Sequence, residues 1–219
     1  MDTKVRTPQE IFTMPQRLLV PLFQRPYVWN EELQWEPLWR DLQNVATRFL
    51  YTPNEVQQPH FLGAVVFQQL QNPIGDLQQR TVIDGQQRLT TLQIMFDAIH
   101  AELVAVGAES PAARIEPLVE NGKPFWKDSN PEDRFKVWPT NKDRPAFNEV
   151  MGAVHPINYG ALKNSDSKLV QAHKFFAKKT EAWLAEAGRG RPFTPPAHRS
   201  GNRPDHPFRH GRIAPGNHH

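Results

Sequence analysis

The chain has 219 residues and a mass of 25.2 kDa, which suits one globular domain with an adjoining tail. An apolar fraction of 38% and a mean hydropathy of −0.63 indicate a polar chain, and no run reaches the roughly 18–20 apolar residues of a membrane helix. Cysteine is absent, which excludes a disulfide framework, a thiolate zinc site and a cysteine nucleophile. The first residues, MDTKVRTPQEIFTMPQ, have charges and prolines in place of the apolar segment of a signal peptide, so the expected compartment is the cytoplasm.

The positive charge is concentrated at the C-terminal end of the sequence. Residues 188–219 contain six arginines and one aspartate, whereas the rest of the chain carries 20 basic and 22 acidic side chains. The pI of about 9.3 is therefore a property of this tail and does not predict DNA binding by the remainder. Because the tail is rich in proline, glycine and histidine, we expect it to be disordered. Two interpretations stay open for it: an arm that contacts nucleic acid, or the truncated or frame-shifted end of a longer pattern.

Alternating strand and helix patterns predict an α/β or α+β fold with a small mixed sheet. Residues 17–23 form a β-favouring run that contains Pro21, which suits an edge strand. A helix is expected to begin at Glu36, with proline in its first turn. The continuous apolar run 61–68 is typical of a strand that is covered on both faces. Residues 72–76, NPIGD, then form a turn.

The second half of the predicted domain begins with the partner strand, residues 78–84. A helix over residues 86–105 follows at once, with leucine, isoleucine and phenylalanine at helical spacing. Residues 135–139, FKVWP, form a further strand candidate. A helix through Val150, capped by Asn141 or by Asp143, and a helix over residues 166–187 complete the pattern.

The segment VIDGQQRLTTLQ, residues 82–93, passes from a strand through a tight turn into a helix. Gly85 allows a close approach of the backbone, and the start of a helix offers free N–H groups and the positive end of its dipole. Such a turn favours an anion such as a phosphate. The alternative is purely structural, with Asp84 as an ordinary N-cap and Gly85 as a turn residue.

Four side chains of this turn are candidates for chemistry. Arg88 is suited to bidentate contacts with phosphate oxygens. Asp84 is suited to hold a divalent metal or a water molecule. Gln86 and Gln87 are neutral, and they are suited to orient a water molecule or to read the edge of a base.

A second motif, VPLFQRPYVWN, lies about sixty residues earlier in the sequence. It places an amide, a cation and two aromatic rings within six residues, namely Gln24, Arg25, Tyr27 and Trp29. Such a set can stack a base and grip a phosphate. The alternative is an edge strand whose aromatic rings pack on the first helix, with Arg25 in a salt bridge.

His60 stands directly before the apolar run 61–68, where it is a candidate phosphate contact or base. The alternative is a polar residue at the end of a strand. The sequence contains no P-loop, because GxxxxGK[ST] is absent, and it shows no convincing acid–acid–lysine nuclease core.

Taken in order, VPLFQRPYVWN, HFLGAVVFQ and VIDGQQRLTTL resemble the N-terminal domain family of GmrSD-type restriction endonucleases. Two later segments, FKVWPTNKDRPAFNEVM and SKLVQAHKFFAKKTEAWL, look like its helical part, so the resemblance covers about residues 8–187. It implies a ParB/sulfiredoxin-like fold, followed by the tail 188–219. The expected late helices of the domain are missing, so the chain resembles a truncated member.

The resemblance also implies a function. It implies that a nucleoside triphosphate, with Mg²⁺, is bound and hydrolysed by the segment that comprises Asp84, Gly85, Gln86, Gln87 and Arg88. It also implies that the second motif lies near the same pocket, and we expect Gln24, Arg25, Tyr27 and Trp29, together with His60, to form the facing wall. The implied partners are DNA, including modified DNA, and an HNH-type nuclease domain.

The chain itself ends before any HNH domain, so we expect a nucleotide-hydrolysing sensor domain of a modification-dependent restriction or phage-defence system, and not a stand-alone nuclease. Two alternatives remain. One is a non-catalytic module that binds DNA or nucleotide and works with a separate nuclease. The other is an inactive truncated fragment.

Overall fold

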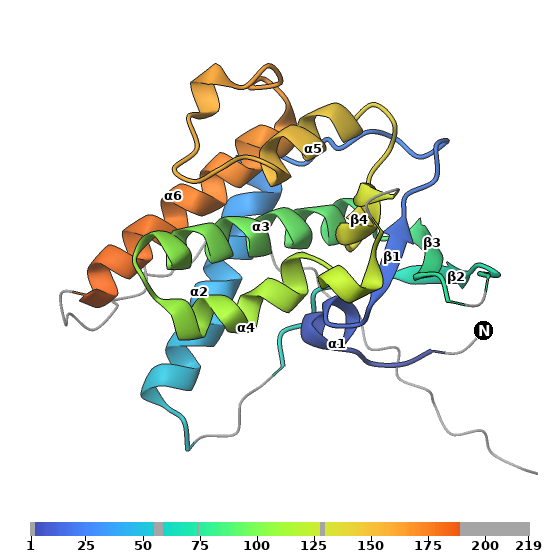
Figure 1. Cartoon of the computed structure of the whole chain (residues 1–219). Helices are drawn as coiled ribbons and strands as arrows, with labels where there is room; N and C mark the ends of the chain where they lie inside the picture. Colours follow the sequence, from blue (N-terminus) through green and yellow to red (C-terminus); the bar gives the residue numbers. More distant parts are fainter. Residues whose placement is uncertain (1–2, 55–58, 74, 128–129, 189–219) are drawn as a thin grey trace, which may run out of the picture.

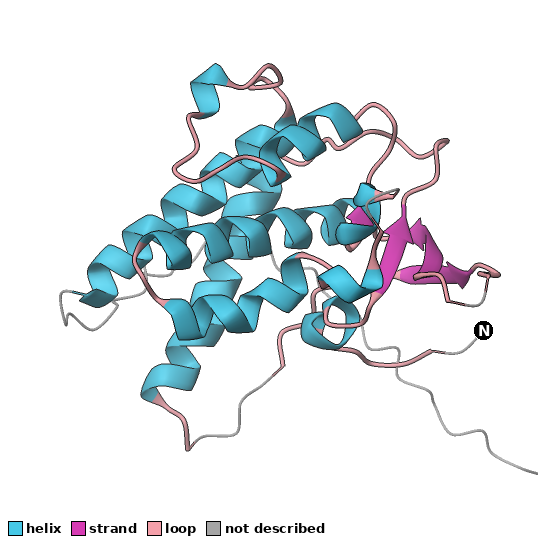
Figure 2. Cartoon of the chain, in the orientation of Figure 1, coloured by secondary structure: helices cyan, strands magenta, loops and turns pink. Residues whose placement is uncertain are grey.

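The computed structural model describes residues 3–54, 59–73, 75–127 and 130–188 (Figure 1). The disorder that we expect for the tail lies outside the described residues, apart from residue 188. Helices dominate the described part, and the sheet lies at one side of it (Figure 2). The α-helices are α1 (Pro8–Phe12), α2 (Glu36–Tyr51), α3 (Gln86–Ala105), α4 (Glu109–Val119), α5 (Arg144–Met151) and α6 (Lys168–Gly188). Shorter helical turns are η1 (Glu31–Trp35), η2 (Lys123–Phe125), η3 (Pro131–Arg134) and η4 (Tyr159–Ala161).

The sheet has four strands in the order β2-β3-β1-β4. Strand β1 runs parallel to both β3 and β4, whereas β2 and β3 are antiparallel, so the predicted mixed sheet is confirmed. The strands are β1 (Gln16–Leu19), β2 (Val66–Gln69), β3 (Gln78–Asp84) and β4 (Val137–Trp138).

The expected edge position of the first strand is wrong, because β1 is paired on both sides. Its strand ends at Leu19, and the last bond toward β4 comes from the Val20 N–H to the Trp138 carbonyl. Pro21 lies one residue beyond that donor. The proline therefore removes no bond from the ladder, and an interior position is compatible with it.

The expectation of a doubly covered strand over residues 61–68 is also wrong. The strand β2 begins only at Val66, and it is an edge strand that pairs with β3 alone. The preceding stretch is irregular and includes Gly63 at φ +100°. Phe61 is 82% exposed, and the last two residues of β2 are exposed as well. An apolar run can thus lie at the edge of a sheet, where the strand pairs with one neighbour and its side chains are only partly buried.

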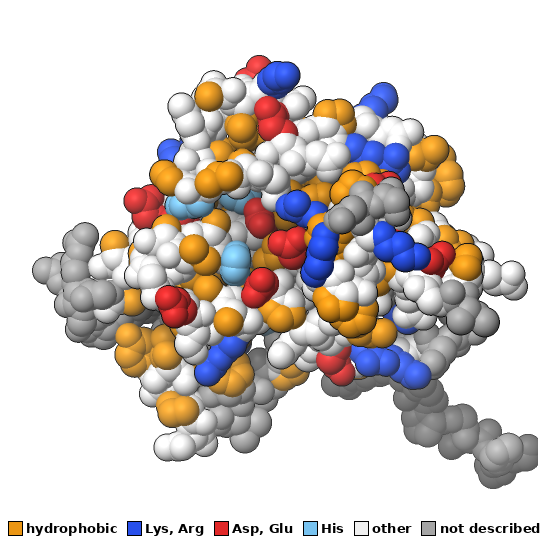
Figure 3. Space-filling model, viewed as in Figure 1, with side chains coloured by type: hydrophobic (Ala, Val, Ile, Leu, Met, Phe, Trp, Pro, Cys, Tyr) orange, Lys and Arg blue, Asp and Glu red, His pale blue; other side chains and the backbone are white. Residues whose placement is uncertain are grey.

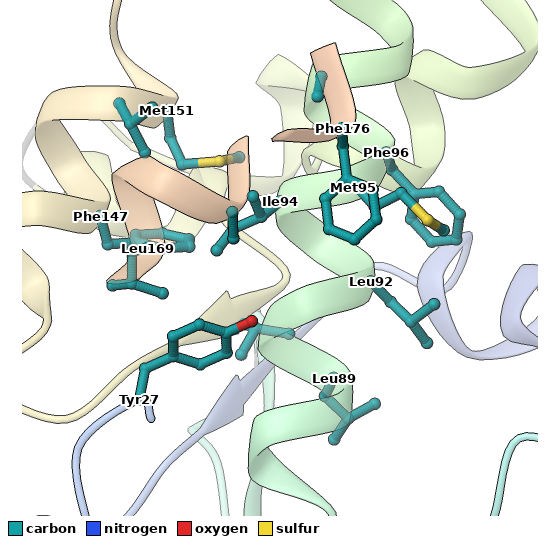
Figure 4. Close-up of a cluster of buried hydrophobic side chains, with 14 of the residues drawn as sticks. Tyr27, Leu89, Leu92, Ile94, Met95, Phe96, Phe147, Met151, Leu169 and Phe176 are labelled. Atoms are coloured by element: carbon teal, nitrogen blue, oxygen red, sulfur yellow. The ribbon is translucent and has the colours of Figure 1, made fainter. Parts of the chain in front are cut away.

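Helix α3 is the centre of the molecule, and it packs against both α4 and α6 (Figure 1). Its side chains are buried on nearly all sides, including the polar Thr91 and Gln93. A helix that is covered all round has no solvated stripe, which explains why its sequence is more uniform than an amphipathic pattern. Figure 4 shows part of the resulting core, with residues Tyr27, Leu89, Leu92, Ile94, Met95, Phe96, Phe147, Met151, Leu169 and Phe176.

Aromatic rings join α2 to α6. The ring of Trp39 on α2 lies 5.6 Å from that of Trp183 in a T-shaped pair, and 6.4 Å from that of Phe176. Trp35, at the end of η1, lies 5.9 Å from Phe175. Trp35 and Trp39 are buried, so these ring contacts hold the helix that begins at Glu36 against α6.

Lys136 is a buried cation beside strand β4. Its Nζ donates to Asn121 Oδ1 at 2.8 Å and to the Met14 carbonyl at 3.2 Å. Burial lowers the pKa of the Lys136 ammonium from 10.5 to about 8. Between these two values the unfolded chain holds this proton and the folded chain does not. Stability contributed by this group therefore rises as the pH is raised from 8 to 10.5.

We expect Lys136→Met to remove that rise. The free energy of unfolding, measured by chemical denaturation from pH 7.5 to 10.5, should increase relative to the variant by up to about 3 kcal/mol. The difference between the two proteins isolates Lys136 from other groups that titrate in this range. Parallel pH profiles for the two proteins would contradict the burial of a charged amine at this position.

Candidate functional site

The DGQQR turn, residues 84–88, joins the end of β3 to the start of α3. The N-cap of α3 is Gly85, at φ 92°, and it provides no side chain to cap the helix. The Asp84 carboxylate instead accepts from the Gly85 N–H at 2.8 Å and is exposed. The first N–H groups of α3 thus have no side-chain cap, and such groups form a binding site for anions.

The segment 61–65 lies directly against this turn. A Cβ atom at Gly85 would lie 2.6 Å from Val65 Cγ1, and one at Gly63 would lie 2.6 Å from Arg88 Nη2. Arg88 Nη1 donates to the Ala64 carbonyl at 2.6 Å. Two glycines therefore permit a close approach that a larger residue would block. The guanidinium of Arg88 is held beside the turn and uses one of its five N–H donors there.

Gln86 connects the turn to the second motif. Its Nε2 donates to Gln24 Oε1 at 3.0 Å and to the Arg25 carbonyl at 3.1 Å. Gln24 in turn donates to the Ile83 carbonyl at 3.1 Å, just before the turn. Two motifs that are about sixty residues apart in sequence therefore meet at the N-terminus of the central helix.

Gln87 makes a second connection of the same kind. Its Nε2 donates to the Pro26 carbonyl at 3.0 Å, and its Oε1 accepts from the Val28 N–H at 2.9 Å. The side chain is 7% exposed, so these bonds replace water for a loop backbone that has few other partners. Gln86 and Gln87 thus position residues 24–28, in addition to the water-orienting role that remains a prediction for them.

Tyr27 lies in the core and not on the surface. Its hydroxyl bonds Thr91 Oγ1 at 2.6 Å and accepts from Trp35 Nε1 at 2.9 Å, and burial raises the pKa of the Tyr27 hydroxyl well above its usual range. With 6% of the residue exposed, its ring offers no free face for stacking a base. Tyr27 instead fixes the second motif to α3 and η1.

The other residues of the expected wall lie nearer to the surface. Arg25 is exposed, and Trp29 is half-buried and packs against the core. His60 is exposed, with Nε2 3.3 Å from Asp41 Oδ2 on α2. Among the described residues no hydrogen bond or ion pair joins His60 to the turn, whereas the backbone of Arg25 is bonded to it through Gln86.

Asp143 is a positioning residue that the sequence did not reveal. It occupies the N-cap position of α5, but its carboxylate makes no capping bond there, so the expected capping by this side chain is wrong. It accepts from the Tyr27 N–H at 3.0 Å and from Thr140 Oγ1 at 2.7 Å. The second motif is therefore held from two sides, by α3 and by the start of α5. The sequence did not show this contact because its donor and acceptor are 116 positions apart. An Asp just before a helix is also expected to cap that helix and not to bond a distant loop.

The described residues contain no group of three or more His, Asp or Glu side chains that suits a metal ion. Asp84 is therefore a single carboxylate ligand candidate. That arrangement fits Mg²⁺, which is commonly held by one or two carboxylates together with substrate phosphates and water. Basic and acidic side chains are interspersed on the face seen in Figure 3, in agreement with the near-neutral charge of the chain before residue 188.

The structure thus defines a small mixed α/β domain with a polar site at the N-terminus of its central helix. The model of the GmrSD restriction endonuclease N-terminal domain matches residues 8–190, and the chain belongs to this family. It is therefore related to components of DNA restriction and defence systems, for which DNA and nuclease partners are general. No curated protein matches the chain. Among the described helices, none combines the length and apolar character that crossing a bilayer requires.

Proposed function

We propose that this chain binds a nucleoside triphosphate together with Mg²⁺ at the DGQQR turn and hydrolyses it, as the sensor domain of a modification-dependent DNA restriction or defence system. The observation that carries this proposal is the combination of a helix start without a side-chain cap, an exposed carboxylate and a guanidinium within five residues. The N–H groups and the guanidinium match a triphosphate in charge and in hydrogen bonding, and the carboxylate matches its Mg²⁺ ion.

Each group has a role that follows from its position. The first N–H groups of α3 and the remaining donors of Arg88 bind phosphate oxygens. Asp84, exposed at the end of β3, holds the metal or orients the attacking water. Mg²⁺ supplies charge neutralisation of the phosphates when it is bound. Hydrolysis then depends on positioning and charge, without a covalent intermediate on the protein.

The second motif supplies the neighbouring surface. Gln86 of the turn donates a hydrogen bond to the Arg25 carbonyl, so the backbone of Arg25 lies directly beside the turn. The Arg25 side chain is exposed and is the second cation candidate for phosphate. Gln24 is bonded to both Gln86 and Ile83, which places its amide between the motifs. Trp29 remains the aromatic candidate of this surface.

Phosphate release from GTP, ATP, CTP and UTP in the presence of Mg²⁺ tests this proposal. We expect turnover by the wild type and a loss of at least about 100-fold in Asp84→Ala and in Arg88→Ala, because each removes charge at the reacting phosphate. Asp76→Asn and Arg114→Gln are matched controls that remove an exposed acid or base elsewhere, and they should keep full activity. Circular dichroism and a cooperative melt must show that each variant is folded.

A non-catalytic binding module is the second candidate function. It is favoured by the engagement of Gln86, Gln87 and Tyr27 in bonds within the protein, which leaves Asp84 as the principal candidate base of the turn. Calorimetric binding of a triphosphate without any turnover, in a cooperatively folded wild type, would establish this module and exclude hydrolysis. If the folded wild type showed no binding and no turnover, both functions would be excluded and the chain would be an inactive fragment.

A further inference from the structure

We propose that a second site, distinct from the DGQQR turn, binds the phosphate backbone of DNA in a groove between η1 and α6. The groove has a volume of 740 Å³ and combines basic, acidic and amide side chains over an aromatic floor. Its lining residues are Asn30, Glu31, Glu32 and Trp35 on one side and Lys168, Gln171, Lys174, Phe175, Lys178 and Lys179 on the other. The site is independent of nucleotide hydrolysis, so failure of one proposal does not decide the other.

Three lysines of α6 line the groove, namely Lys168, Lys174 and Lys178, and all three are exposed. Lys174 and Lys178, four positions apart, lie on the same face of the helix. Local helix energetics disfavour this arrangement. Lys168 lies at the N-terminus of α6, where the helix dipole repels a cation, and Lys174 and Lys178 are like charges four positions apart. A bound polyanion would relieve both repulsions.

Within the part of the chain that the structure describes, Lys179 is the only lysine of the groove that forms an ion pair with a carboxylate. Lys179 is paired with Glu36 at 2.6 Å, so its charge is already matched. Among the described residues, Lys174 and Lys178 form no ion pair with any carboxylate. The helix dipole explains the positions of Glu31 and Glu32, because acidic side chains in the first turn of a helix stabilise it. No such local effect explains the positions of the three lysines.

The shape of the groove favours a phosphate backbone over a peptide. Lys168 and Lys178 are ten positions apart, which corresponds to roughly 15 Å along α6. That length is about the rise of four phosphates on one DNA strand. The rings of Trp35 and Phe175 form the floor but are 3% and 7% exposed, so the groove offers no deep apolar pocket for the anchor residues of a protein partner. Family membership supplies DNA as the general partner.

Fluorescence polarisation with a labelled 20-base-pair duplex and the full chain tests the proposal between 50 and 200 mM salt. Lys174→Gln with Lys178→Gln should weaken binding about tenfold at 0.1 M salt and reduce the salt slope by about 1.8, because two phosphate contacts are lost. Glu31→Gln with Glu32→Gln should strengthen binding, since repulsion of the backbone is removed. Arg114→Gln with Lys127→Gln removes the same charge outside the groove, and it should change the affinity less than twofold.

Opposite effects of the lysine and glutamate pairs, with the control pair unchanged, are the expected result. Equal losses in the groove pair and the control pair would overturn the proposal and assign binding to overall charge or to residues 188–219. Poly-glutamate provides the comparison with an acidic polypeptide. If the lysine pair weakened binding of poly-glutamate and left DNA binding unchanged, the groove would be a protein-docking surface, and the DNA assignment would be wrong.

Discussion

Replacing Trp39 by alanine is expected to lower the free energy of unfolding by about 3–5 kcal/mol. Trp39 is 1% exposed, and its ring contacts Phe176 and Trp183 on α6. Truncation removes these contacts and leaves a cavity between α2 and α6 that neighbouring helices fill only in part. Chemical denaturation followed by circular dichroism measures the change directly.

Phe49→Ala is the matched control for this substitution. Phe49 belongs to the same helix but is 58% exposed, so its truncation should cost less than about 1 kcal/mol. Similar costs for the two variants would mean that α2 does not pack on α6 through Trp39. Trp39→Phe should fall between the two, since an aromatic ring of smaller volume retains part of the contact.

Gly85→Ala is expected to destabilise the fold by about 1–3 kcal/mol and to abolish nucleotide hydrolysis at the proposed site. The residue has φ 92°, a conformation that disfavours every side chain. In addition, the new Cβ would lie 2.6 Å from Val65 Cγ1, so the turn or the segment 61–65 has to shift. Such a shift moves Asp84 and the first N–H groups of α3 relative to each other. Unfolding curves and phosphate release measure the two effects.

Gly75→Ala separates backbone strain from steric overlap. Gly75 has nearly the same φ, +89°, but nothing lies within 4 Å of the position of its Cβ atom. It should therefore show the cost of the conformation alone and retain hydrolysis. If the two alanine variants lost equal stability and equal activity, the contact between Val65 and Gly85 would have no part in the site.

Local signals in the sequence predict the centre of the fold well. The strand 78–84, the turn at Gly85 and the helix 86–105 follow one another without interruption, and the structure has β3 and α3 at the same bounds. A strand-to-helix turn of this kind is set by residues that are neighbours in the chain. The position of this turn can therefore be predicted from the sequence alone.

Two of the described α-helices were not predicted. Helix α4 reads ESPAARIEPLV, and its two prolines indicate a break, although Pro117 lies inside the helix near its end. Helix α1 has five residues, too few to show a helical period. It did contain a readable signal, because Thr7 and Glu10 form a capping box in which each bonds the backbone of the other.

The remaining differences depend on contacts between distant parts of the chain. Whether β1 lies at the edge of the sheet is decided by β4, more than one hundred residues later, and no local pattern encodes that pairing. The burial of Tyr27 depends likewise on Thr91 and Asp143. The sequence identified the polar residues of the candidate site, but it did not distinguish those that hold the loop from those left free for a ligand.

The bonds from Gln86 and Gln87 to the second motif have a consequence for how the site forms. They span 59 to 62 positions, so each closes a loop of about sixty residues, at an entropic cost of about 3–4 kcal/mol if it formed alone. No single amide bond offsets that cost, and the pairing persists only when the surrounding core is packed. Secondary structure can therefore survive in a chain whose two motifs are apart. The capacity to bind a ligand at the turn should follow the tertiary structure and not the helix content.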